Sequence, residues 1–204
     1  MITKAISTIL TMYGVQSFIL IFCIIFIETG LVFIPFLPGD SLLFITGTFL
    51  ATSGYQPIYT ILLLSLAAIL GDLVNYCLGK KYGLHLREIP IIGKWIKETT
   101  LQRTEHFFAR HGQGAIFIGR FIPIIRTCIP FVAGIGKMKP VHFFRFNILG
   151  GVAWVSVGVL AGYFFGRITF VKQHFAFIML IIIFLSALPL LVIAIKKKVG
   201  NIYD

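Results

Sequence analysis

Long hydrophobic runs alternate with short basic loops along this chain of 204 residues. The first run covers residues 15–50, and its only charges are Glu28 and Asp40. A straight helix of that length would be roughly 54 Å long, whereas the hydrocarbon core of a bilayer is about 30 Å thick. Segment 34–40 contains two prolines and a glycine, which end a helix. We therefore predict a re-entrant hairpin over residues 15–53, which enters and leaves the membrane on one face.

The later hydrophobic runs are shorter and have the length of a single crossing. We predict transmembrane helices over residues 57–79, 146–166 and 175–195. The run 114–136 is also long enough, but it contains two arginines and two prolines, and cations flank both of its ends. Because cations mark the cytoplasmic side, both ends are expected on that side. Residues 114–136 are therefore predicted to form a second re-entrant hairpin.

Residues 80–113 form the longest polar segment. They carry seven lysines and arginines against three acids, which indicates a cytoplasmic loop. Within this loop, a stretch from Thr99 to a stop at Gly112 predicts a short surface helix. Its Phe107 and Phe108 are expected at the membrane interface.

The two halves of the chain resemble each other, since each predicted hairpin is followed by a crossing. Segment 34–47 is similar to segment 122–134, and charge bias places the two hairpins on opposite faces of the membrane. Such an inverted repeat is typical of secondary transporters, which hold substrate near the midplane. The predicted fold class is all-α integral membrane: an inverted repeat of two re-entrant helical hairpins, each followed by a transmembrane helix, plus a C-terminal transmembrane helix. Residues 1–204 form one membrane domain.

Composition and charge agree with this picture. Hydrophobic residues make up 58% of the chain and charged residues 12%, against about 25% charged in a soluble domain. The formal net charge is +11. These cations lie in short loops between apolar runs, which favours anionic lipid headgroups over nucleic acid as partners.

Four charges inside the apolar runs are the main candidates for function: Glu28, Asp40, Arg120 and Arg126. A charge at bilayer depth costs at least about 2.5–3.5 kcal/mol, so these four are expected to pair or to face water. One interpretation is a neutral salt-bridge cluster that only ties the hairpins together. The other is a pocket in which the two arginines bind a phosphate, since a guanidinium suits bidentate phosphate binding. In that pocket, protonation of the acids would free the arginines for the ligand.

Other residues are expected to complete this site. Asp72 is a third candidate acid, which either couples to ions in the pocket or bonds to a neighbouring helix end. Tyr76, Trp154 and Tyr163 are expected to be interface or packing aromatics. The residues predicted to support the pocket are Pro38, Gly39, Pro123, Thr127, Asn75 and Asn147.

Enzyme motifs are absent from the sequence. There is no Walker A motif, no GxSxG and no HExxH, and the five histidines do not have metal-ligand spacing. We therefore expect no enzymatic activity, no cofactor and no bound metal.

Three groups of motifs together resemble one known family. The first half contributes Glu28, Pro38-Gly39-Asp40, Gly71-Asp72, Tyr76, Gly79 and Gly83. The most specific motif is Gly119-Arg120-Phe121-Ile122-Pro123 with Arg126-Thr127, Pro130 and Ala133-Gly134. Asn147, Gly150, Trp154, Gly158, Gly162-Tyr163 and Gly166 complete the pattern. Over residues 15–170 the chain resembles the DedA family of membrane proteins, although Ile124-Ile125 stand where many members have a glycine before the second arginine.

The resemblance implies lipid translocation by a multi-pass protein of the bacterial cytoplasmic membrane. The C-terminus is expected in the cytoplasm, because Lys196-Lys197-Lys198 follow the last apolar run. A second copy of the chain, in a homo-oligomer, is a further candidate partner. Family members are associated with undecaprenyl phosphate, phosphatidylethanolamine or other phospholipids, and with proton or sodium coupling. The family's essential acids and arginines match Glu28, Asp40, Arg120 and Arg126.

The leading hypothesis is a flippase that returns undecaprenyl phosphate for recycling, driven by a proton or sodium gradient. Arg120 and Arg126 would bind the phosphate, and Glu28 and Asp40 would couple to the ion. The alternatives are a phosphatidylethanolamine or other phospholipid flippase or scramblase, a proton-coupled cation antiporter, and a scaffold that transports nothing.

Overall fold

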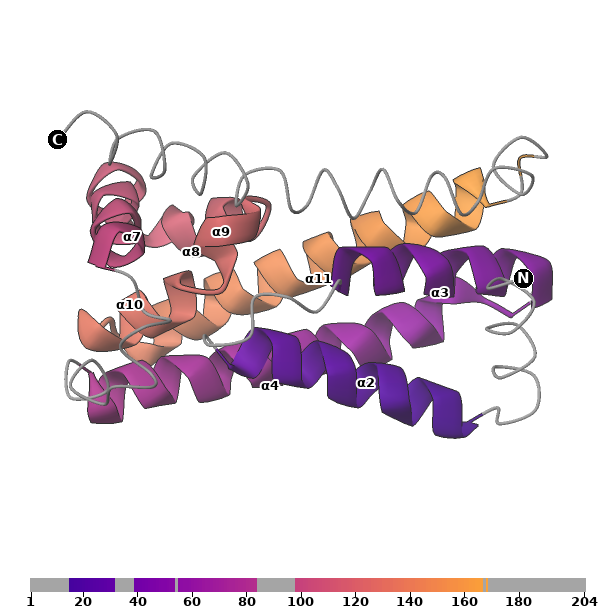
Figure 1. Cartoon of the computed structure of the whole chain (residues 1–204), viewed down its shortest axis with the longest axis horizontal. Coiled ribbons are helices and arrows are strands. Elements are labelled where there is room, and N and C mark those ends of the chain that lie inside the picture. Colours follow the sequence, from indigo (N-terminus) through magenta and orange to yellow (C-terminus); the bar gives the residue numbers. More distant parts are fainter. Residues whose placement is uncertain (1–14, 32–38, 54, 84–97, 167, 169–204) are drawn as a thin grey trace, which may run out of the picture.

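The computed structural model describes residues 15–31, 39–53, 55–83, 98–166 and 168, and these residues form helices with no strand among them (Figure 1). The elements are α2 (Val15–Gly30), α3 (Gly39–Ser53), α4 (Pro57–Tyr82), α7 (Glu98–His111), η1 (Gly112–Gly114), α8 (Ala115–Gly119), α9 (Pro123–Arg126), α10 (Ile129–Ile135) and α11 (Pro140–Phe165). The predicted all-α class is confirmed for this part of the chain. The predicted crossing over residues 175–195 lies outside it.

Helices α4 and α11 are the long apolar elements of the described chain, and each has the length and composition of a membrane crossing. With 26 residues apiece, each is about 39 Å long, which exceeds the hydrocarbon thickness of about 30 Å. They run antiparallel, because Tyr76 stacks on Phe143 with 4.3 Å between ring centroids while Asn147 bonds to Ile69 further back along α4. Helix α4 continues past the predicted end at residue 79, and α11 begins before residue 146.

Helices α2 and α3 pack along these two long helices, α2 on α4 and α3 on α11. The α3–α11 contact is close: a Cβ at Gly47 would overlap the backbone of Val159, and one at Gly162 would overlap the backbone of Phe44. Small residues at such crossings let helix backbones approach each other. The chain reverses direction between α2 and α3, with residues 32–38, including Pro38, outside the described part.

The run 114–136 is broken into three short helices, α8, α9 and α10. Pro123 opens α9 and a second proline lies in the first turn of α10, positions where the missing N–H costs nothing. The chain turns back on itself here, because Gly119 at the end of α8 lies against Ile129 at the start of α10. The predicted breaks are therefore present. The re-entrant placement of both segments in the membrane, and the inverted repeat, stay predictions.

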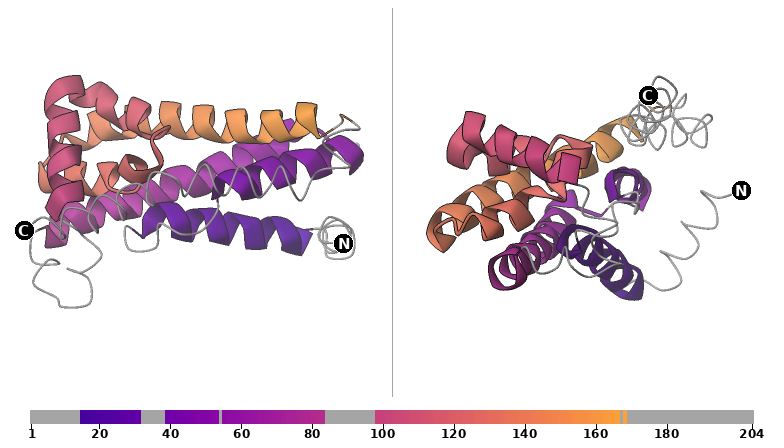
Figure 2. Two further views of the ribbon diagram at one scale, coloured as in Figure 1. Left: turned by 45° about the horizontal axis from the view of Figure 1, so that its top comes forward. Right: turned by 60° about the vertical axis from the view of Figure 1, so that its left-hand side comes forward.

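Helix α7 occupies the position of the predicted surface helix and lies across the end of the bundle where α4 ends and α11 begins (Figure 2). Its Phe107 and Phe108 are half-buried and pack against a cluster that includes Tyr76, Ile129 and Phe143. These two rings dock α7 on the bundle, and their place at the membrane interface stays a prediction.

Candidate functional site

Arg126, at the end of α9, joins three segments of the chain. Its Nη1 donates to Asp40 Oδ1 at 2.8 Å, and its Nη2 forms an ion pair with Glu28. Glu28 lies near the end of α2, and Asp40 lies in the first turn of α3. The arginine therefore links the facing ends of α2 and α3 to the broken segment between α8 and α10, and brings these three predicted site residues together.

Trp154 of α11 completes this group. Its indole Nε1 donates to Asp40 Oδ1 at 2.9 Å, and the Arg126 guanidinium lies 4.7 Å from the centroid of its ring. We call Glu28, Asp40, Arg126 and Trp154 the Arg126 cluster. The sequence interpretation of Trp154 as a packing or interface aromatic missed this role. The signal was available, because an indole N–H at bilayer depth needs an acceptor.

Glu28 is the most enclosed member of the Arg126 cluster, with 1% of its surface exposed. Its Oε1 accepts from the Gly39 N–H at 3.3 Å as well as from Arg126, whereas its Oε2 has no hydrogen-bond partner among the described residues. A buried polar atom without a partner is rare in a folded protein. This oxygen is therefore a position where a proton or a bound group can be accommodated.

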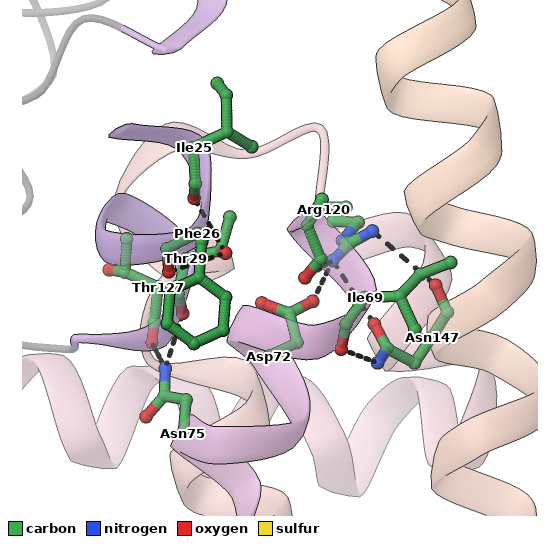
Figure 3. Close-up of polar contacts among 10 residues, drawn as sticks. Ile25, Phe26, Thr29, Ile69, Asp72, Asn75, Arg120, Thr127 and Asn147 are labelled. Carbon is green, nitrogen blue, oxygen red and sulfur yellow. Dashed lines mark hydrogen bonds and ion pairs between the residues drawn. The ribbon is translucent and has the colours of Figure 1, made fainter. Parts of the chain in front are cut away.

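Arg120, which follows α8, has a different set of partners (Figure 3). It forms an ion pair with Asp72 of α4, and its Nη2 lies 3.2 Å from Asn147 Oδ1 and 3.4 Å from the Ala68 carbonyl oxygen. The side chains of Arg120 and Asp72 are only 6% and 7% exposed. We call Arg120, Asp72 and Asn147 the Arg120 cluster.

The separation into two clusters corrects the prediction of one neutral group of four charges. Arg120 pairs with Asp72 rather than with Glu28 or Asp40. This contact places Asp72 among the buried charges of the site, and its predicted role in ion coupling stays a prediction. Three carboxylates thus face two guanidinium groups, so the fully ionised set carries one net negative charge instead of none.

Two of the predicted supporting residues, Asn75 and Asn147, bind backbone around the two clusters. Asn75 Nδ2 donates to the carbonyl oxygens of Thr127 at 2.9 Å and Thr29 at 3.3 Å, which ties α4 to α2 and to the segment after α9. Asn147 Nδ2 donates to the Ile69 carbonyl oxygen at 3.1 Å, which orients its Oδ1 toward Arg120. Gly39 must lack a side chain, because a Cβ there would overlap the Glu28 carboxylate.

Two cavities adjoin the clusters. The inner cavity, about 10 Å³ in volume, has room for roughly one water molecule. It lies against the acids Glu28 and Asp72. The outer cavity, about 280 Å³, is partly open and lies against Asp40, with Phe121, Val157 and Gly158 as its apolar wall. Arg120, Arg126 and Trp154 line both cavities and therefore form the partition between them.

The chemistry of this site is that of charge and hydrogen bonding. Both guanidinium groups border the outer cavity, where an anion of phosphate size could exchange with their carboxylate partners. Among the described residues, no group of three or more His, Cys, Asp or Glu side chains comes together as a metal site.

Comparison with known proteins identifies the family. The model of the VTT domain matches residues 34–164. Protein DedA of Escherichia coli (strain K12) is 42% identical over 188 residues, which cover 91% of this chain and 85% of that protein. Inner membrane protein YqjA of the same organism is 36% identical over 201 residues, which cover 94% of this chain and 89% of that protein. Uncharacterized membrane protein Rv0364 of Mycobacterium tuberculosis (strain ATCC 25618 / H37Rv) is 41% identical over 179 residues, which cover 86% of this chain and 78% of that protein. No solved structure matches the chain.

The family match includes both arginines and two of the three acids of the site, and it begins after Glu28. Two of these relatives are named as membrane proteins, one of them of the inner membrane, and α4 and α11 have the length and apolar composition of crossings. With identities of 36–42% over most of its length, the chain belongs to the DedA family of membrane proteins, which is defined by the VTT domain.

Proposed function

We propose that this protein flips undecaprenyl phosphate across the bacterial cytoplasmic membrane for recycling, coupled to a proton or sodium gradient. The observation that carries the proposal is the position of Arg120 and Arg126, which both border the partly open outer cavity. A phosphate in this cavity would meet two guanidinium forks, and its isoprenyl chain would meet the apolar wall. No covalent step is required, so the proposal describes a transporter and not an enzyme.

The charge balance supports coupling to a cation. Because three carboxylates already face the two arginines, a phosphate would raise the net negative charge of a poorly solvated site. Neutralisation of one or more acids by a proton or sodium ion removes this cost. Glu28 suits this role, since its Oε2 has no partner among the described residues. Phosphate and cation would then bind together, and both would be released together.

The sharpest test compares flipping by two variants in proteoliposomes that contain undecaprenyl phosphate. Arg126→Ala is expected to slow flipping by tenfold or more, the equivalent of about 1.5–3 kcal/mol for a lost charge-assisted hydrogen bond. Arg145→Ala is the matched control, because Arg145 is an exposed cation of α11 that lines neither cavity. Flipping at the parent rate by Arg126→Ala would contradict the proposal. Binding of the purified variants to the lipid checks that the loss arises at the headgroup.

A phospholipid substrate is the second candidate, and one contact favours it. Asp40 also lines the outer cavity, and 32% of its side chain is exposed. A carboxylate beside two guanidinium groups suits a headgroup that carries both an ammonium and a phosphate, as phosphatidylethanolamine does. Flipping of both lipids should be compared with and without a pH or sodium gradient, since a scramblase needs neither. Cation flux that persists in Arg126→Ala without any lipid flipping would instead support an antiporter.

A further inference from the structure

A third cavity lies apart from both charge clusters, between α7 and the turn that joins α10 to α11. Its volume is about 520 Å³, within the range of roughly 300–1,000 Å³ that is usual for small-molecule sites. Its apolar wall is formed by Phe108 of α7, Val132 and Ala133 of α10, and Met138 of the turn. Neither the proposed transport step nor any residue of the two clusters uses this space.

The wall of this cavity is held in place by hydrogen bonds. The Tyr76 hydroxyl donates to the Met138 carbonyl oxygen at 2.5 Å, and the Met138 N–H donates to the Ala133 carbonyl oxygen at 3.0 Å. Lys137, the residue before Met138, adopts a φ of 50°, a left-handed conformation that is uncommon for a residue other than glycine. The turn is thus fixed by contacts on both sides, and the cavity next to it is a defined part of the fold.

Charges of opposite sign line the two sides of the cavity. Glu105 projects from α7, while Lys139 and His142 belong to the start of α11. No ion pair joins Glu105 to Lys139 or His142 in the part of the chain that the structure describes. Lys139 is also the residue that precedes the first turn of α11, where the helix dipole adds partial positive charge. One side of the cavity therefore favours an anion, and the other favours a cation.

The position of the cavity indicates what kind of molecule reaches it. Its lining comes from α7, α10 and the start of α11, which meet at the end of the bundle where α4 ends. Lys80 and Lys81 in the last turn of α4, and Lys137 in the α10–α11 turn, are exposed cations at this end. Since α4 and α11 have the length of crossings, their paired ends lie at the level of the lipid headgroups. Basic residues gather at this level on the cytoplasmic side of membrane proteins. The molecules in reach are thus phospholipid headgroups.

We propose that this cavity binds the headgroup of a zwitterionic aminophospholipid of the surrounding leaflet. Its phosphodiester would bind Lys139 and His142, its ammonium would bind Glu105, and its glycerol backbone would lie on the apolar wall. Such a lipid joins α7 to the α10–α11 turn and remains resident there. The proposal is independent of which lipid crosses through the outer cavity, because the two sites share no residue.

Native mass spectrometry of the full chain in detergent, with defined lipids added, tests this proposal. Phosphatidylethanolamine should bind more tightly than phosphatidylglycerol, which lacks the ammonium. Glu105→Gln should weaken phosphatidylethanolamine binding about tenfold, the effect of one lost charge-assisted hydrogen bond, and should leave phosphatidylglycerol binding unchanged. The double variant Lys139→Gln/His142→Gln should weaken the binding of both lipids.

Lys80→Gln is the matched control, because Lys80 is an exposed cation at the same end of the bundle that does not line the cavity. If Lys80→Gln weakens binding as much as the double variant, lipids bind only to a generally basic surface and the proposal is overturned. It is also overturned if Glu105→Gln leaves the preference for phosphatidylethanolamine intact. A dimer that carries no lipid and dissociates in Glu105→Gln would show that a second copy of the chain occupies this face.

Discussion

The Arg126 cluster and the Arg120 cluster each stabilise a buried guanidinium group, but with different partners. Arg126 is bonded to two carboxylates and covered by the ring of Trp154. Arg120 has one carboxylate, Asp72, and its other partners are the neutral oxygens of Asn147 and Ala68. Protonation of a carboxylate removes its negative charge and weakens its bond to the arginine, whereas a neutral amide or carbonyl oxygen keeps its bond. The Arg126 cluster can therefore exchange both of its charged partners for a ligand, whereas Arg120 would keep its neutral partners and continue to hold the fold when a ligand replaces Asp72.

Exposure leads to the same distinction. The side chains of the Arg120–Asp72 pair are 6% and 7% exposed, while those of the Arg126–Asp40 pair are 12% and 32% exposed. Water or a ligand can replace a lost partner only where it has access. Breaking the Arg120 cluster should therefore reduce stability as well as transport, whereas breaking the Arg126 cluster should reduce transport with a smaller loss of stability. Four sets of variants test this distinction.

The largest effect is expected from Arg120→Met, which leaves Asp72 buried without its partner. Loss of one member of a buried ion pair costs about 3–5 kcal/mol of stability. The double variant Arg120→Met/Asp72→Leu should recover most of this loss, because it removes both charges. Arg126→Met should cost less, since Asp40 keeps the Trp154 N–H and Glu28 keeps the Gly39 N–H. Thermal unfolding of the purified variants in one detergent measures all three, and equal losses for Arg120→Met and Arg126→Met would contradict the distinction.

Arg126→Lys retains the charge and changes its geometry. A single ammonium cannot reproduce the fork that reaches Asp40 with one nitrogen and Glu28 with the other. Flipping in proteoliposomes should fall by tenfold or more, about 1.5–3 kcal/mol, while the unfolding temperature changes little. Arg145→Lys serves as the control at an exposed position. A parent-like rate in Arg126→Lys would mean that only the charge of Arg126 matters.

Two glycine variants disturb one cluster each by steric overlap. A Cβ at Gly39 would overlap the Glu28 carboxylate, and a Cβ at Gly151 would overlap the Arg120 guanidinium. Overpacking of this kind costs about 1–3 kcal/mol. Both variants should slow flipping, and Gly151→Ala should lower the unfolding temperature more than Gly39→Ala does. Gly114→Ala is the control, since nothing lies within 4 Å of a Cβ at that position. Identical profiles for Gly39→Ala and Gly151→Ala would argue against separate roles.

The smallest effect is expected from Trp154→Phe, which retains an aromatic ring over Arg126 and removes the N–H that Asp40 accepts. One lost hydrogen bond of this kind corresponds to about 1 kcal/mol, or roughly a fivefold change in flipping rate. Trp154→Leu also removes the ring and should slow flipping further, because the cation–π contact is lost. If Trp154→Phe and Trp154→Leu behave alike, the N–H alone accounts for the role of Trp154.

The sequence predicted which residues belong to the site better than it predicted their contacts. Glu28, Asp40, Asp72, Arg120 and Arg126 all lie in the two clusters or on the cavities beside them. They could be found because a charge in an apolar run is costly whatever its partner is. The role of Trp154 was missed because a tryptophan in an apolar run also fits simple packing or a place at the membrane interface. The re-entrant insertion of the broken segments and the inverted repeat remain predictions.

The sequence by itself determined the α-helical membrane character of the chain, the breaks at its prolines and the set of buried charges. Each of these follows from local physical chemistry: hydrophobicity over a window, a missing N–H, and the cost of an ion in an apolar environment. Only the tertiary structure decided that Arg120 pairs with Asp72, 48 residues away, while Arg126 takes Glu28 and Asp40. The reason is that the partner of a buried charge depends on which helices pack together, and this is a long-range property that no single segment encodes.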